Sequence, residues 1–356
     1  MMRRKLIDVI LFILCKKSSF ELKLLRYGIA LIGCPSLLSI FKVELKDTIP
    51  VFNGIEIRYG EISSFSLYLG VILIIISLSI YSLKEIRLYK KKKFGLYQQY
   101  LMNDLEQNFS ETVNKKAKSE VIITKTNISY LVSNNMLQSA KEALIRIDED
   151  IKTLIKNASD YDNAILYYGE LMSVPFTFYT GMELDDRYPI TVFDYDRRDG
   201  RWKEIKDIIN SEFSPNISIE NNGNNSGNSI ISIGVSYPLN ENEIRNNFPD
   251  YPISKISIDP ININNHWNIS FQKKLQEKFF KLAQELGASG TKTIHLILSA
   301  QNSVSFNLGR CYDNRNLPEI IVYQYEKGNK IKYPWGVKMK TSGIQKAEII
   351  TTVQKN

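Results

Sequence analysis

The chain has 356 residues, of which 44% are hydrophobic and 24% charged, a composition typical of a folded protein with room for one large or two ordinary domains. Its three widely spaced cysteines exclude a disulfide framework and a cysteine-rich zinc site, and its two histidines, His266 and His295, leave little material for histidine-based catalysis. The formal charge of +8 does not indicate a nucleic-acid-binding surface, because residues 1–100 hold 16 Lys/Arg against 7 Asp/Glu and the rest of the chain holds 30 against 31.

Two apolar stretches near the N-terminus predict membrane-spanning helices. Residues 65–83 contain no charge over 19 positions, enough helix to cross a bilayer, and residues 24–41 contain one charge, Arg26, near one end. The basic segment 1–23 is expected to lie at the membrane interface rather than to be a cleaved signal peptide. Lys and Arg flank the outer ends of the two-helix unit 24–83, which predicts two passes with both termini cytoplasmic. Plain anchoring and helix–helix association both stay open as roles for these spans.

The segment after the spans changes character. Residues 84–119 are basic and then amphipathic, which predicts a cytoplasmic helical stalk or linker. Strand and helix patterns alternate from there to about residue 340, as is typical of Rossmann-like folds with parallel sheets. The expected strands are 121–127, 164–168, 190–195, 230–236, 254–258, 293–298 and 319–325, and the clearest amphipathic helices are 141–157 and 270–287.

An internal repeat organises this region. Residues 173–200 align without a gap with residues 301–328, at an offset of 128. The identical pairs are Phe178 and Phe306, Gly181 and Gly309, Asp185 and Asp313, Arg187 and Arg315, Tyr195 and Tyr323, and Gly200 and Gly328. The repeat favours an ancient duplication, with a first half over 120–219, an Asn/Gly-rich linker over 220–229 and a second half over 230–345.

Two fused units of this kind form a pseudo-dimer, whose strand carboxyl ends face a shared crevice where open α/β sheets bind ligands. Neither a Walker phosphate loop nor a G-x-G-x-x-G fingerprint occurs in the sequence. The predicted fold is therefore two N-terminal transmembrane α-helices followed by an α/β domain of tandem Rossmann-like units with mainly parallel sheets.

Several segments carry a resemblance to a known family. They are TIHLILSAQNSVSFNLGRCY with EIIVYQYE, their counterpart ILYYGELMSVPFTFYTGMEL with ITVFDYDRRDGRW, and the strand ISIGVSYPL. An apolar strand, a polar turn, a small-residue helix ending at Gly and an aromatic-rich strand together resemble the SAVED domain, which consists of two fused CARF-like units. The similarity covers about residues 120–340. One departure is the turn that opens the helix at residue 302, which reads SAQNS where a small or Pro-containing turn is expected, and it leaves the ligand type open.

With two spans ahead of this region, the chain resembles a membrane-spanning SAVED effector of CBASS anti-phage defence. The resemblance implies that a cyclic di- or trinucleotide, made by a partner nucleotidyltransferase, binds the crevice and drives homo-oligomerisation. The helices would then disrupt the bacterial inner membrane and cause abortive infection. Membrane lipids are implied partners, and genomic DNA or RNA is not. Two alternatives stay open: a membrane-tethered sensor that regulates another protein, and a membrane-bound ring nuclease that cleaves its ligand.

Such a ligand requires backbone N–H groups and small polar side chains for its phosphates and sugars, and aromatic or Arg planes for its bases. The candidate ligand-binding residues lie at strand ends and turns: Ser299, Gln301, Asn302, Ser303 and Arg310 in one turn and helix, Gly169, Ser173 and Pro175 in the equivalent turn, Ser236 and Tyr237 at a third strand end, Arg197 and Arg198 for countercharge, and Trp335 for stacking. The structural alternatives are helix capping for the polar turn at 299–303, solvated charge for Arg197 and Arg198, pairing with Asp313 for Arg310 and core packing for Trp335. Glu170 is expected to bind a base amino group or to point away.

Catalysis finds little support in the sequence. Paired carboxylates such as Asp194 and Asp196 have neither a metal-binding His nor a basic catalytic partner nearby. The sequence therefore predicts no catalytic residue, no metal site and no cofactor other than the bound ligand.

Overall fold

The structure is a computed structural model, and it describes residues 19–33, 59–100, 106–133, 136–137, 139–161, 164–185, 187–206, 215–223, 227–341 and 346–352. The chain divides into two compact units, Met1–Lys91 and Lys92–Asn356.

Two helices of the N-terminal unit, α2 (Phe20–Gly33) and α4 (Tyr59–Lys90), pack against each other at a pair of glycines. A Cβ atom on Gly28 would lie 2.8 Å from the carbonyl oxygen of Gly70, and one on Gly70 would lie 2.8 Å from the carbonyl oxygen of Gly28. Glycine is required at both positions because the two backbones approach so closely. Small residues at a helix–helix contact are typical of helices that associate within a membrane.

Serine hydroxyls add hydrogen bonds between the same two helices. Ser66 donates to the carbonyl oxygen of Leu31 at 2.6 Å, and Ser77 donates to that of Glu21 at 2.7 Å. The Glu21 carboxylate also forms an ion pair with Lys84 at 2.8 Å. The small and polar residues of the predicted spans therefore serve a contact within one chain.

Among the described residues, one helix is long and apolar enough to cross a membrane. It is the window Phe65–Lys84 of α4, only 17% of which is buried, whereas the core helix of a soluble protein is mostly buried. This window coincides with the predicted span 65–83. Of the other predicted span, 24–41, residues up to 33 belong to α2 and the remainder lies outside the described residues, as do residues 1–18 of the predicted interfacial segment.

The C-terminal unit contains a five-stranded sheet in the order β2-β1-β5-β6-β7. Its strands are β1 (Lys93–Gln99), β2 (Ile122–Asn127), β5 (Ile165–Leu171), β6 (Ile190–Asp196) and β7 (Arg201–Glu204). The first four are parallel, and β7 is an antiparallel edge strand. A separate two-stranded sheet is formed by β3 (Val132–Ser133) and β4 (Met136–Leu137).

A seven-stranded sheet follows in the order β14-β13-β12-β11-β9-β10-β8. Its strands are β8 (Asn216–Glu220), β9 (Asn228–Gly234), β10 (Ile253–Asp259), β11 (Thr293–Ser299), β12 (Glu319–Gln324), β13 (Trp335–Lys338) and β14 (Glu348–Thr351). Strands β10, β9, β11 and β12 are parallel, and the outer strands are antiparallel. The run β10-β9-β11-β12-β13 repeats the order of the first sheet, as a duplication requires.

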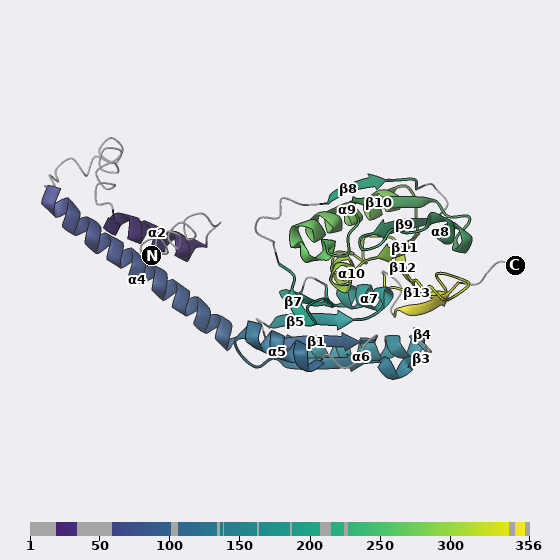
Figure 1. Cartoon of the computed structure of the whole chain (residues 1–356), viewed down its shortest axis with the longest axis horizontal. Helices are drawn as coiled ribbons and strands as arrows, with labels where there is room; N and C mark the ends of the chain where they lie inside the picture. The colour runs from purple at the N-terminus through teal and green to yellow at the C-terminus, as the bar shows by residue number, and fades with distance from the viewer. Residues whose placement is uncertain are drawn as a thin grey trace. The chain divides into compact units, whose positions relative to one another are not determined.

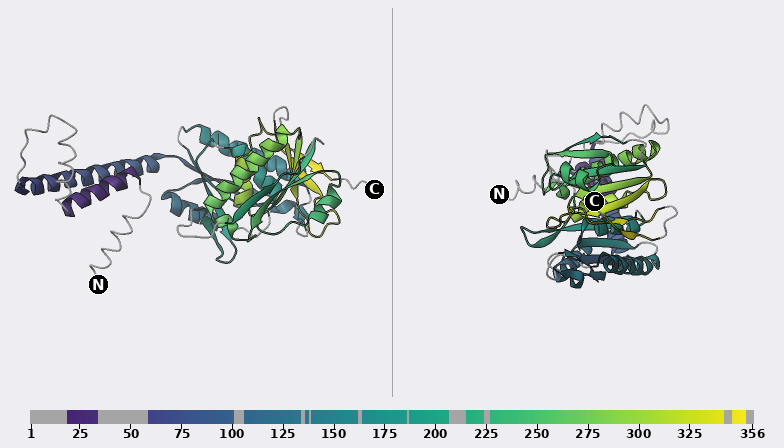
Figure 2. Two further views of the ribbon diagram at one scale, coloured as in Figure 1. Left: turned by 90° about the horizontal axis from the view of Figure 1, so that it is seen from above. Right: turned by 90° about the vertical axis from the view of Figure 1, so that its right-hand side faces the viewer.

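Helices lie on both faces of these sheets. They are α5 (Glu106–Ala117), α6 (Ala140–Ser159), α7 (Val174–Leu184), α8 (Glu241–Asn247), α9 (Ile269–Ala288) and α10 (Asn302–Arg310), with short 3₁₀ turns η2 (Ser129–Leu131) and η3 (Asn265–Trp267). Figures 1 and 2 show α7 and α10 between the two sheets. Helix α7 packs on β12 and β13, and α10 packs on β5 and β6, so each lies on the sheet of the other half. One apolar core consequently runs through both halves.

The crossing of α7 and α10 follows the internal repeat. A Cβ atom on Gly181 would lie 2.1 Å from the carbonyl oxygen of Phe306, and one on Gly309 would lie 2.1 Å from that of Phe178. These four residues make up two of the identical pairs, so the two contacts are equivalent to each other under the internal repeat. The Phe306 ring also stacks on Tyr168 of β5, with ring centres 3.7 Å apart. Glycine is therefore required at both equivalent positions, because the backbone of the opposing helix lies against each of them.

All the expected strands and both expected amphipathic helices occur, with ends shifted by a few residues. The predicted helical stalk is wrong for residues 93–99, which form the fully buried strand β1. A parallel strand buried on both faces has no alternating pattern, and the polar Gln98 and Gln99 hid its apolar character. The first sheet thus begins well before residue 120. Strand β8, ahead of the expected linker, pairs with β10 and belongs to the second sheet.

Candidate functional site

In both halves the order of the strands across the sheet reverses between two equivalent strands: between β1 and β5 in the first half, and between β9 and β11 in the second. Strands β1 and β5 end together at Gln99 and Leu171, and β9 and β11 end together at Gly234 and Ser299. Parallel α/β sheets bind ligands beyond the strand carboxyl ends at such a switch point. The Asn302 side-chain amide donates to two carbonyl oxygens of the first half, of Glu170 and Met172, each at 3.3 Å. The two switch points therefore meet, and we call the ends of β5 and β11 with the first turns of α7 and α10 the strand-end site.

The N-terminus of α10 is occupied by a carboxylate of the chain itself. The Ser303 backbone N–H donates to Oδ2 of Asp194 at 3.1 Å, and Oδ1 of Asp194 accepts from the Tyr195 N–H at 2.9 Å. Asp194 is buried at the end of β6, and Ser303 is only 1% exposed. A carboxylate is favourable at a helix N-terminus, because it balances the partial positive charge there. Ser303 thus takes part in helix capping, and this backbone N–H is not open to a phosphate.

The N-terminus of α7 is different. Ser173 is its N-cap residue, yet its side chain makes no capping hydrogen bond. Its hydroxyl oxygen is buried and has no hydrogen-bond partner among the described residues. Pro175 follows in the first turn, where its missing N–H leaves no backbone donor unsatisfied. This end of the strand-end site therefore keeps an uncompensated polar group.

Further polar side-chain atoms buried at or just beyond the ends of β5 and β9 form no hydrogen bond of acceptable geometry in the described part of the chain. They are both carboxyl oxygens of Glu170, the hydroxyl of Tyr168 and the hydroxyl of Ser236. Burial raises the pKa of Glu170 to about 8 and the charge of Asp194 adds to the shift, whereas Thr177, Tyr168 and Asn302 beside the carboxyl lower the pKa. Buried polar atoms without partners are costly, so native proteins satisfy nearly all of them with water, ions or ligands. These atoms form a polar floor beneath the strand-end site.

Other predicted residues form the rim. The Ser299 carbonyl oxygen accepts from the N–H groups of Val235 and Ser236, at 2.8 and 3.0 Å, which ties β11 to the end of β9. Gln301 is the half-buried N-cap residue of α10. Tyr237 is 62% exposed and lies three residues beyond the end of β9. An aromatic ring and an amide are thus accessible at this edge.

Arg197 and Arg198 are exposed in the turn between β6 and β7. The Arg198 guanidinium donates to the Asn264 side chain of the second half at 3.2 Å. In the same turn, the ion pair with Lys203 at 2.8 Å lowers the pKa of Asp196 to about 2. The turn therefore holds the ion pair between Asp196 and Lys203, and two exposed arginines, next to the contact between the halves.

Three predicted residues lie away from the strand-end site. Arg310 is at the other end of α10, where it donates to the carbonyl oxygens of Asp185 and Tyr188 at 2.8 and 3.3 Å. Gly169 faces the outer side of its sheet, since a Cβ atom there would lie 2.3 Å from the Phe109 ring. Trp335 is 8% exposed and packs in the core. Residue type alone does not show which face of a strand, or which end of a helix, a side chain occupies.

Sequence reasoning missed the roles of Tyr168 and Asp194 altogether and left that of Glu170 open. Each is a polar residue inside an otherwise apolar strand, and that interruption is the signal that would have found them. The described part of the chain holds no group of three or more His, Cys, Asp and Glu side chains placed to bind a metal ion.

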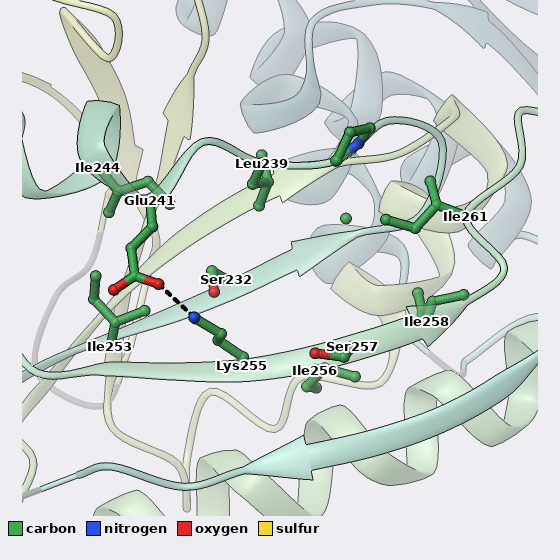
Figure 3. A pocket seen from close by; sticks show the side chains of 12 residues that line it. Ser232, Leu239, Glu241, Ile244, Ile253, Lys255, Ile256, Ser257, Ile258 and Ile261 are labelled. Carbon is green, nitrogen blue, oxygen red and sulfur yellow. Dashed lines mark ion pairs between the residues drawn. The ribbon is translucent and has the colours of Figure 1, made fainter.

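A small pocket lies beside the end of β9 (Figure 3). It has a volume of about 200 Å³ and apolar walls that include Leu239 and Ile258, with an ion pair between Glu241 and Lys255 at its edge. This volume is below the 300 Å³ or so that small-molecule sites usually have. The pocket is therefore too small for a nucleotide.

Comparison with known protein families finds one match. Residues 145–339 match the family model of SAVED, the SMODS-associated and fused to various effectors sensor domain. No curated protein matches the sequence. Among solved structures, the chain is similar to the Cap4 SAVED/CARF-domain containing receptor of Acinetobacter baumannii with the cyclic trinucleotide 2′3′3′-cAAA, at 13% identity and a TM-score of 0.49, over 85% of this chain and 65% of that one.

The corresponding receptor of Moraxella osloensis is also 13% identical, with a TM-score of 0.45, over 82% of this chain and 63% of that one. The chain thus spans less than two thirds of the length of either receptor.

Proposed function

We propose that this chain, which belongs to the SAVED family of sensor domains, binds a cyclic oligonucleotide at the strand-end site. The observation that carries the proposal is the set of buried polar atoms without a hydrogen bond of acceptable geometry where the two duplicated halves meet. A cyclic oligonucleotide has repeating phosphates and sugars and thus suits a site built from two related units. Its hydroxyls and base edges supply the hydrogen bonds that these atoms lack.

The surrounding residues suit different parts of such a ligand. Gln301 offers an amide for phosphate or ribose oxygens, Asn302 keeps its side-chain carbonyl oxygen for a ribose hydroxyl, and Tyr237 offers an exposed ring on which a base can stack. Arg197 and Arg198 supply the positive charge. Glu170, in the floor of the site, suits a base. A protonated carboxyl both donates and accepts a hydrogen bond, as does the edge of adenine.

Ligand binding drives homo-oligomerisation, and the clustered helices then disrupt the inner membrane in a CBASS response that ends in abortive infection. The ligand comes from a partner nucleotidyltransferase. Support comes from α4, which exposes Phe65, Tyr68 and Leu78 along its apolar window. The small residues of α4 are used within the chain, so these large apolar side chains remain for lipid or for other copies. The proposed topology is two passes with the sensor domain in the cytoplasm.

The test uses the full chain in liposomes loaded with a fluorescent dye. A panel of cyclic di- and trinucleotides is added, and both dye leakage and ligand integrity are measured. Leakage with one intact ligand supports the proposal. Binding without leakage favours a tethered sensor that regulates another protein, and ligand breakdown favours a ring nuclease.

A matched pair of variants locates the site. Gln301→Ala is expected to weaken ligand binding by roughly tenfold, the effect of losing one or two hydrogen bonds to a charged group. Gln284→Ala changes the same residue type on the exposed face of α9 and should bind as the unmodified protein does. Equal affinities of the two variants would place the ligand elsewhere.

A further inference from the structure

A second, larger pocket lies at the carboxyl ends of α7 and α10. Its volume is about 980 Å³. Both helices begin at the strand-end site and end here, so the two sites lie at opposite ends of the crossing pair. Gln276 of α9 and Lys340 complete the walls. The volume is at the upper end of what small-molecule sites have.

The internal repeat places an equivalent pair of arginines on the walls of this pocket. Arg187 and Arg315 are exposed, and among the described residues neither guanidinium forms a hydrogen bond or an ion pair. Two of the other identical pairs have an evident structural role. Phe178 and Gly181, with their equivalents, form the helix crossing, and Gly200 occupies a turn at φ 62°. The fold supplies no comparable reason for the arginine pair.

The pocket also contains acidic residues, and two of them are committed to the protein. Glu183 forms an ion pair with Lys340 at 2.7 Å. The Asp313 carboxylate accepts from the Arg315 N–H at 3.0 Å and from the Asn316 amide at 2.6 Å. It therefore shapes the turn that presents Arg315.

The third acidic residue, Asp185, has a backbone φ of 47°, which non-glycine residues rarely adopt. This conformation accompanies the 2.8 Å hydrogen bond from Arg310 to its carbonyl oxygen, which holds a third guanidinium in the pocket wall. The described lining of the pocket thus carries Arg187, Arg310, Arg315 and Lys340 against Glu183, Asp185 and Asp313, a formal charge of +1. Arg310 offsets the partial negative charge at the C-terminal end of α7, and the guanidinium groups of Arg187 and Arg315 are the cations left for an anion among the described residues.

We propose that this pocket is a second ligand site, which binds a diphosphate group between Arg187 and Arg315. A guanidinium binds phosphate through two parallel hydrogen bonds, so two arginines suit two adjacent phosphates. The diphosphate can be free or part of a nucleotide. The site is separate from the strand-end site and needs no cyclic ligand.

The test is isothermal titration of the full chain in detergent with inorganic pyrophosphate and with ADP. Saturable binding of one pyrophosphate per chain is expected. Equal affinities identify the diphosphate as the recognised group, whereas tighter binding of ADP shows that a nucleoside is bound as well. Arg187→Gln and Arg315→Gln should each weaken pyrophosphate binding by about tenfold or more, and the double variant by about 100-fold.

Arg201→Gln is the matched control, since Arg201 is an exposed arginine of β7 outside the pocket. It should bind pyrophosphate as the unmodified chain does. The variants Arg187→Lys and Arg315→Lys keep the charge and should lose less affinity than the Gln variants. Absence of saturable binding, or a double variant that binds as tightly as the control, would overturn the proposal.

Discussion

The two halves of the C-terminal unit share their topology but not their strand-end chemistry. At the offset of 128 residues, Tyr168, Glu170 and Asp194 of the first half correspond to Leu296, Leu298 and Val322 of the second. The first half thus places a buried polar layer where the second has an apolar core, whereas the helix crossing is the same in both. The two halves keep the same residues where the backbones of α7 and α10 touch. They differ in residue type where the side chains reach the strand-end site. The site is therefore asymmetric: the first half supplies most of its floor, and the second half supplies the Ser236 hydroxyl of the floor and the Gln301 amide of the rim.

The outer faces of the two sheets differ as well. Helix α5 covers the first sheet over 12 residues, and Phe109 packs there against Trp202 with ring centres 5.1 Å apart. Helix α8 has only 7 residues, and a pocket of about 430 Å³ remains on the second sheet. His295 lines this pocket, and burial lowers its pKa to about 4, so it is neutral at physiological pH. The second half is thus the less completely covered one.

The largest effect is expected at the feature that the halves share. Gly181→Ala and Gly309→Ala each place a methyl group 2.1 Å from a carbonyl oxygen of the opposing helix. Each should lower the free energy of unfolding by about 3 kcal/mol or more, because the helices must separate. The measurement is thermal unfolding of the full chain in detergent.

Gly328→Ala is the control for these two variants, since no atom lies within 4 Å of the added methyl group. It should change stability by less than about 0.5 kcal/mol. If one crossing variant proved as harmless as Gly328→Ala, the two helices would not contribute equally to the crossing.

The contrast between shared packing and divergent chemistry also explains how much could be predicted. Strands such as β11 follow from apolar runs bounded by turns, and α9 from its helical periodicity. The repeat aligns Gly181 with Gly309, but it does not show that each glycine contacts the backbone of the helix that carries the other. The Asp194–Ser303 contact joins residues 109 positions apart. Which carboxylate caps which helix depends on how the halves dock, and local sequence does not encode that.

A second effect is expected in the polar layer that only the first half has. The pKa of Glu170 is raised from 4.5 to about 8, so the folded protein holds a proton that the unfolded chain loses. This contribution to stability is complete below pH 4.5 and is lost as the pH rises through about 8. At about 1.4 kcal/mol per pH unit, the free energy of unfolding should fall by about 2 kcal/mol between pH 6 and pH 8.

Glu170→Gln removes the titrating group and should flatten this part of the pH profile, measured by urea unfolding at each pH. Glu277→Gln on the exposed face of α9 should keep the full slope. A Glu170→Gln variant with an unchanged slope would show that Glu170 is already ionised in the folded protein.

The smallest effect concerns the helix ends themselves. Asp194→Ala removes the carboxylate that accepts from the Ser303 N–H and should cost about 1–2 kcal/mol, the usual loss for a helix cap. Ser173→Ala changes the N-cap residue of α7, whose buried hydroxyl has no partner in the described structure, so it should cost nothing or stabilise slightly. Urea unfolding of the two variants compares the helix ends directly. Equal costs would mean that Ser173 caps α7 in solution and that the two ends are alike. A cost at Asp194 alone would leave the α7 end as the one whose hydroxyl still needs an external partner.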